Sequence, residues 1–125
     1  MDIIISNDSD KPIYEQITSQ IKNQIMQGSL REGDALPSMR TLAKELRISV
    51  ITTKRAYEEL EREGFITTVV GKGSFIKAAD MRLLREENLK KIEEHIDEIV
   101  RLAASCNLSK QEIMEMVHFS LEEQG

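Results

Sequence analysis

The chain has 125 residues, enough for one or two small domains with a modest hydrophobic core. Hydrophobic residues make up 40% and charged residues 31%, the usual balance of a globular protein. No stretch approaches the ~20 apolar residues of a membrane helix, and the N-terminus lacks the basic segment of a signal peptide. The single cysteine, Cys106, excludes an intrachain disulfide and a cysteine-based zinc cluster. We therefore expect a cytoplasmic protein without a membrane anchor.

The net charge of −5 is distributed unevenly along the chain. Residues 79–125 hold 6 basic and 11 acidic residues, whereas residues 40–77 hold 8 basic and 5 acidic residues. An acidic chain as a whole is a poor ligand for nucleic acid, but a locally basic segment can still bind phosphate. The separation of charge predicts two different tasks in one chain.

The first predicted element is an amphipathic helix over residues 11–27. Ser9 or Asp10 is its expected N-cap, and Gly28 is its expected left-handed stop. The isoleucines before it, at residues 3–5, could form an edge strand or an ordered arm. The apolar positions of the helix recur every four residues and are Ile13, Ile17, Ile21 and Ile25.

Two shorter helices and a hairpin are predicted next. The helices cover residues 38–46 and 49–63, each begins at a serine suited to capping, and only a tight turn separates them. Residues 65–76 are rich in β-branched side chains on both sides of a glycine turn at 71–73, which predicts a β-hairpin. Three helices with a tight turn between the last two, followed by a hairpin, form the winged helix-turn-helix. The predicted fold is mainly α with a small β-hairpin.

A long helix capped by Asp80 is predicted to run to about residue 105. A capping box at residues 109–112 then opens a last helix, with Asn107 as the breaker between the two. The long helix has an apolar stripe at spacings of three and four residues, a heptad pattern. This stripe could be core against the last helix, but the short partner cannot cover it, so we expect a dimer interface. Its residues are Leu89, Ile92, Ile96, Ile99 and Ala103.

Four stretches in a fixed order carry a family resemblance. They are Pro12–Ile17, Gly33–Ala43, Lys54–Gly64 and Gly71–Phe75. These stretches resemble the GntR family of bacterial transcription regulators, and the short acidic C-terminal region is similar to that of its YtrA-like branch. The resemblance implies a winged helix-turn-helix DNA-binding domain over residues 1–78 and a two-helix dimerisation domain over 79–125. It implies a homodimeric repressor on a palindromic operator.

The same resemblance places the DNA contacts on the second helix, the third helix and the hairpin turn. These contacts are Arg40, Ser49, Val50, Ile51, Thr52, Lys54, Gly71, Lys72 and Gly73. Arg40 and Lys54 offer long donors to a phosphate or a guanine, and the turn glycines let the backbone approach the minor groove. Arg55 is a further candidate for DNA contact, but it could instead pair with Glu59 one helical turn later.

Val50 and Ile51 depart from the family pattern, in which polar residues or proline are usual. Apolar side chains cannot hydrogen-bond to base edges, but they can contact thymine methyl groups. We therefore expect thymines opposite Val50 or Ile51 in the operator. The alternative function is a winged-helix module that uses this apolar face to bind a protein and no DNA.

No constellation of residues predicts an enzyme, a metal site or a bound cofactor. His95 and His118 lie apart from each other and have no second histidine one helical turn away. Cys106 is expected to be inert. About 48 residues after the hairpin leave little room for an effector pocket of ~300 Å³. The presence and identity of a small-molecule effector therefore stay open.

Overall fold

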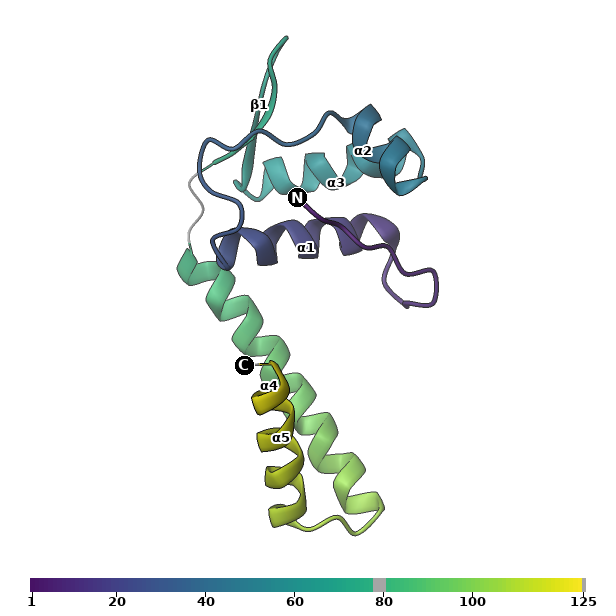
Figure 1. Ribbon diagram of the computed structural model, residues 1–125, viewed down its shortest axis with the longest axis vertical. Coiled ribbons are helices and arrows are strands. Elements are labelled where there is room, and N and C mark those ends of the chain that lie inside the picture. The colour runs from purple at the N-terminus through teal and green to yellow at the C-terminus, as the bar shows by residue number, and fades with distance from the viewer. Residues whose placement is uncertain (78–80, 125) are drawn as a thin grey trace. The chain divides into compact units, whose positions relative to one another are not determined.

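The structure is a computed structural model that describes residues 1–77 and 81–124 (Figure 1). Its contacts divide the chain into two compact units, Met1–Leu84 and Arg85–Gly125. The predicted domain boundary after residue 78 lies outside the described residues, as does the predicted cap Asp80. In chain order the elements are α1 (Ile13–Met26), α2 (Met39–Leu46), α3 (Val50–Arg62), β1 (Ile66–Val69), β2 (Gly73–Ile76), α4 (Met81–Ser105) and α5 (Lys110–Gln124).

The core of the first unit lies between α1, α2, α3 and the hairpin. The isoleucine stripe of α1 faces inward, and Ile17 and Ile21 are completely buried against α3. From α3, Ala56 and Leu60 are equally buried. This removal of apolar side chains from water is the main stabilisation of the unit. The predicted mainly α fold with a small β-hairpin is confirmed.

The first helix begins differently from the prediction. Its N-cap is Pro12, which has no side-chain capping bond, so the predicted cap by Ser9 or Asp10 is wrong. Pro12 occupies the position before the first helical turn, and its carbonyl oxygen accepts the amide of Gln16 at 3.1 Å. The Ser9 hydroxyl instead accepts the amide of Lys11, outside the helix. Proline is suited to this place because it has no N–H group that would need a partner.

The helix-turn-helix has the two predicted serine caps. The Ser38 hydroxyl accepts the amide of Thr41, and the Ser49 hydroxyl accepts the amide of Thr52, each at 3.1 Å. Between the helices, Arg47 takes a left-handed conformation with φ 57°. The tight turn thereby presents the first residues of α3 at the surface.

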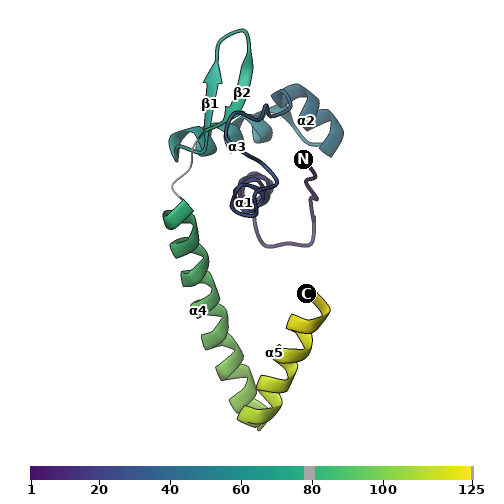
Figure 2. The same cartoon turned by 60° about the vertical axis from the view of Figure 1, so that its left-hand side comes forward.

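The hairpin is a two-stranded antiparallel wing (Figure 2). Its register pairs Ile66 with Ile76 and Val69 with Gly73. Gly71 and Gly73 have φ angles of 78° and 109°, a region that disfavours side chains, so the tight turn depends on glycine. The amide of Leu36 also donates to the carbonyl oxygen of Ser74 at 2.9 Å, which ties the loop before α2 to the wing.

The N-terminal residues form an arm along α1 and no strand, which decides between the two predicted alternatives. Side-chain amides of glutamines one helical turn apart on α1 hydrogen-bond to the backbone of alternate arm residues. The pairs are Gln16 with Ser6, Gln20 with Ile4 and Gln24 with Asp2. The arm is therefore fixed by backbone bonds that do not depend on its own side chains.

The second unit contains two helices that meet at a short turn and diverge from it (Figure 2). Asn107 follows the end of α4 and has a left-handed φ of 57°, in agreement with its predicted role as the breaker. The Ser109 hydroxyl accepts the amide of Glu112 at 3.1 Å and contacts its carboxylate, which confirms the predicted start of α5. Ala103 is buried near the turn, but the larger apolar residues of the stripe are not.

Candidate nucleic-acid interface

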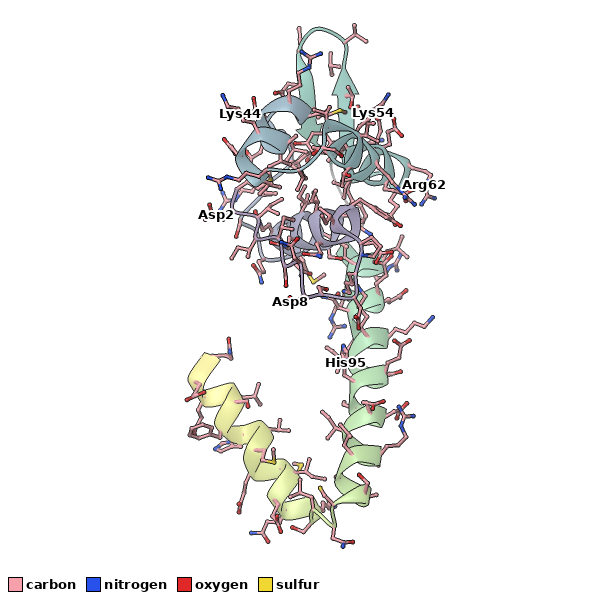
Figure 3. All side chains as sticks on the ribbon, turned by 90° about the vertical axis from the view of Figure 1, so that its right-hand side faces the viewer. Asp2, Asp8, Lys44, Lys54, Arg62 and His95 are labelled. Carbon is pink, nitrogen blue, oxygen red and sulfur yellow. The ribbon has the colours of Figure 1, made fainter. Side chains whose placement is uncertain are left out.

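Three elements of the first unit present the candidate DNA-binding residues: the start of α2, the outer face of α3 and the tip of the wing. Arg40 lies in the first turn of α2 and is exposed. Figure 3 shows Lys44 of α2 and Lys54 of α3 at the end of the unit from which the wing projects. This arrangement gathers long basic side chains beside an exposed helix, as DNA binding needs.

The outer face of α3 is defined by the side chains that it does not bury. Thr53 faces the core together with the buried Ala56, Tyr57 and Leu60. Val50 and Ile51 point outward and keep 44% and 81% of their surface exposed. Two apolar side chains thus occupy the leading end of the helix that faces solvent.

The hydroxyl groups of Ser49 and Thr52 take part in the cap of α3. Ser49 Oγ lies 2.8 Å from Thr52 Oγ1 and also accepts the Thr52 amide. These bonds stabilise the first turn of α3. Ser49 and Thr52 were both predicted to contact DNA from this turn. The Thr52 hydroxyl can still donate its proton outward, because it accepts in the bond to Ser49.

The two basic residues of α3 have different partners. Lys54 Nζ lies 3.8 Å from a Glu58 carboxylate oxygen, and both side chains are well exposed. A pair of this kind contributes little and is easily exchanged for a phosphate. The guanidinium of Arg55 instead lies 3.8 Å from the centre of the Tyr14 ring of α1.

Glu59, the alternative partner expected for Arg55, pairs with Arg62. The distance between Arg62 Nη2 and Glu59 Oε2 is 2.5 Å. This hydrogen bond is the main reason that the pKa of Glu59 lies below its ordinary value, and the charge of Arg55 lowers it further. The structure therefore leaves the N–H groups of Arg55 free of a direct bond to Glu59.

The tip of the wing combines one cation with an apolar side chain. Lys72 is exposed between the two turn glycines, and its amide donates to the carbonyl oxygen of Val69 at 2.9 Å. Val70 keeps 97% of its surface exposed. Val70 is absent from the DNA contacts predicted from the sequence, although its place beside the glycine turn marks it as a residue of the tip.

Tyr57 joins α3 to the start of α2. Its hydroxyl donates to the carbonyl oxygen of Pro37 at 2.6 Å, immediately before the Ser38 cap. Burial, with a smaller effect from Glu45, raises the pKa of Tyr57 far above its ordinary value. The bond fixes the loop that positions Arg40. No role for Tyr57 is predicted from the sequence, because its partner Pro37 lies 20 residues away along the chain.

The described residues offer no group of three histidine, cysteine, aspartate or glutamate side chains that could hold a metal ion. His118 lies 3.0 Å from Glu122 on the same helix. Across the part of the chain that the structure describes, no helix has the length and apolar character needed to cross a membrane.

The first unit is thus a winged helix-turn-helix domain, the class of domain in which the second helix of the turn enters the DNA major groove. Residues 13–76, just over half of the chain, match the family described as bacterial regulatory proteins, gntR family. The chain belongs to the GntR family. It is a transcription regulator with a DNA-binding domain, and not an enzyme.

Comparison with individual proteins extends this result beyond the winged helix. The HTH-type transcriptional repressor YtrA of Bacillus subtilis is 35% identical over 87% of this chain and 84% of that protein. A crystal structure described as a transcriptional antiterminator from Listeria monocytogenes EGD-e has a TM-score of 0.69 at 32% identity, over 96% of this chain and 90% of that one.

A GntR family transcriptional regulator from Listeria monocytogenes has a TM-score of 0.67, also at 32% identity, over 89% of this chain and 96% of that one. These matches cover most of both chains, so the likeness includes the helices that follow the wing. The predicted membership of the short YtrA-like branch is confirmed.

Proposed function

We propose that the protein is a homodimeric repressor that binds a palindromic operator in the cytoplasm through α2, α3 and the wing. The observation that carries the dimer is the uncovered apolar surface of the second unit. Within the family of DNA-binding regulators to which the chain belongs, such a surface supplies the symmetry that a palindrome requires.

The heptad stripe of α4 is buried within its own unit only at Ala103. Four of its five residues, Leu89, Ile92, Ile96 and Ile99, are between 41% and 52% exposed. On α5 the large apolar residues are exposed as well: Met114, Met116, Val117, Phe119 and Leu121. Monomeric proteins rarely leave so many large apolar side chains of one small unit in water.

A second copy of the same unit is the occupant that this surface fits. Heptad spacing on α4 is self-complementary, because a helix with the same stripe can place its side chains into the gaps of the first. A two-fold interface of this kind repeats the same contacts on both subunits. It would place two copies of α3 about one DNA turn, ~34 Å, apart on a palindrome.

Repression follows from occupancy of the operator and needs no further activity. The relative YtrA of Bacillus subtilis is named a repressor, which supports the same sign of regulation here. Steric exclusion of the polymerase needs only a well-placed and tight complex, and the basic excess of residues 40–77 supports the attraction to DNA phosphates.

Selection of bound duplexes from a random pool tests the proposal directly. We expect an enriched palindrome, and fluorescence anisotropy on that duplex should show affinity that falls steeply with salt, with a log–log slope near −0.9 for each phosphate neutralised. A selected sequence without two-fold symmetry would contradict the dimer. Binding that is weak and insensitive to salt would favour the alternative role, binding to a protein.

A pair of charge-matched variants isolates the dimer interface. Ile96→Lys places a charge in the apolar stripe, whereas Glu94→Gln changes the net charge by the same amount on the opposite face of α4. We expect sedimentation to show a monomer for Ile96→Lys and a dimer for Glu94→Gln. A dimer in both variants would place the interface elsewhere.

A further inference from the structure

We propose that Tyr14 of α1 is a positioning residue for DNA binding: its ring holds the guanidinium of Arg55 where it can bind a phosphate of the operator. The inference rests on the DNA-binding function and adds a residue outside α2, α3 and the wing. The finding behind it is the stacking of the two side chains, with 3.8 Å between the Arg55 Cζ atom and the ring centre.

The position of Arg55 on α3 favours a phosphate over a base. Ile51, one turn earlier on the same side of α3, is 81% exposed and points outward, whereas the guanidinium of Arg55 lies against Tyr14 and is therefore displaced toward the flank beside α1. An α-helix is about 10–12 Å across and the major groove is about 12 Å wide. Side chains at the flank of an inserted helix therefore meet the phosphates that border the groove.

Stacking leaves the hydrogen-bonding groups of Arg55 available. A guanidinium is planar, so a ring covers its face while its N–H groups point outward in the plane. Two of these N–H groups can donate hydrogen bonds to two oxygens of one phosphate at the same time. Glu59, the nearest acidic competitor on the same helix face, is hydrogen-bonded to Arg62.

The space around the pair is open on the surface. A groove of about 450 Å³ lies between the start of α1 and the outer face of α3. Its lining residues are Pro12, Ile13, Tyr14, Ile51, Thr52 and Arg55. The Tyr14 hydroxyl donates to Glu15 over a long 3.4 Å, whereas the ring of the same side chain contacts Arg55.

A free arginine loses considerable rotational freedom when it binds a phosphate. Because Tyr14 restricts the guanidinium before DNA arrives, part of that loss is incurred on folding and does not weaken the complex. Removal of the ring should therefore weaken DNA binding even though the ring itself contacts no phosphate.

The test is a double-mutant cycle on the duplex recovered by selection, measured by anisotropy over a range of salt concentrations. We expect Arg55→Gln to weaken binding about tenfold and to reduce the salt slope by about 0.9. Tyr14→Leu should weaken binding about two- to fivefold, whereas Tyr14→Phe, which keeps the ring, should bind like the wild type. In the Arg55→Gln background, Tyr14→Leu should cause no further loss.

Lys110→Gln is the matched control, because it removes one positive charge from the second unit and leaves the partners of Arg55 and Glu59 unchanged. It should leave the salt slope unchanged. If Tyr14→Leu weakens binding equally in the wild type and in the Arg55→Gln variant, Tyr14 has a purely structural role and the inference is overturned. A loss in Tyr14→Phe as large as in Tyr14→Leu would assign the effect to the hydroxyl and overturn it as well.

The outcome for the wild type separates this inference from the function on which it rests. Wild-type protein that shows no salt-dependent binding to any selected duplex would overturn both. Wild-type protein that binds with a steep slope, together with a Tyr14→Leu variant that binds equally well, would overturn only the role of Tyr14.

Discussion

The side-chain amide of Gln20 pairs with the backbone of Ile4 as a neighbouring strand would. Gln20 Oε1 accepts the Ile4 amide at 2.9 Å, and Gln20 Nε2 donates to the Ile4 carbonyl oxygen at 2.7 Å. A glutamine amide carries the same donor and acceptor as a peptide group. Helix α1 thus binds an extended N-terminal segment through a side-chain amide, in place of the backbone of a neighbouring strand.

Removal of this amide should release the arm. For Gln20→Leu we expect the free energy of unfolding to fall by about 1–2 kcal/mol, the usual cost of lost hydrogen bonds. The Ile4 amide should also exchange its hydrogen faster. Asn23→Leu, at an exposed position of the same helix, is the control. Unchanged exchange at Ile4 in Gln20→Leu would show that apolar contacts of the arm are sufficient.

The raised pKa of Tyr57 predicts that the folded protein loses stability at alkaline pH. Its pKa is raised in the folded state, so the native protein keeps the hydroxyl proton at pH values where the unfolded chain has lost it. The contribution is complete below the unfolded pKa of about 10 and is lost as the pH rises above it. Urea denaturation at pH 8 and pH 11 should therefore show a larger decrease for the wild type than for Tyr57→Phe.

The same variant tests the bond to Pro37. Tyr57→Phe leaves that carbonyl oxygen without its tyrosine donor, and we expect it to destabilise the protein by about 1–2 kcal/mol at pH 7. Equal stability of the two proteins at pH 7 would show that the hydrogen bond adds nothing beyond the packing of the ring.

The outward-facing Ile51 predicts a dependence on thymine methyl groups. Replacement of operator thymines by uracil removes only the methyl group, and each methyl that Ile51 contacts should contribute about 0.8 kcal/mol. Wild-type protein should lose affinity on the uracil duplex, whereas Ile51→Ala, which keeps only the methyl contacts of Val50, should lose less. Equal binding of both duplexes by the wild type would place Ile51 away from thymine.

A fragment that ends at residue 87 separates DNA contact from assembly. It retains Leu84, which is only 2% exposed and belongs to the core of the first unit. We expect a folded monomer with a concentration-independent melting temperature, whereas the full chain should melt higher as its concentration rises. Operator affinity should fall by two orders of magnitude or more. Full affinity in the fragment would remove the role proposed for the C-terminal helices.

The elements whose signals are local could be predicted from the sequence. Ser38, Ser49 and Ser109 mark helix starts because a hydroxyl needs only the amides of the next three residues. The turn at Gly71 and the breaker Asn107 depend on their own backbone angles. In each case the stabilising interaction lies within a few residues along the chain.

Interactions between distant residues escaped the prediction. Tyr14 and Arg55 are brought together only when α1 packs on α3, and no spacing in the sequence indicates that contact. The bonds from Gln20 to the arm have the same character, since a polar residue on a helix surface usually faces water. For Arg55 the sequence left open a pair with Glu59, and the contact with Tyr14 on another helix was not among the alternatives.

The uncovered stripe on α4 has a consequence for dosage. When operator binding requires the dimer and the monomer predominates, the active species varies with the square of the protein concentration. A cell that halves its supply of the chain would keep about a quarter of the dimer. The apolar residues Leu89, Ile92, Ile96 and Ile99 would in this way set a threshold for switching, which operates even without an effector molecule.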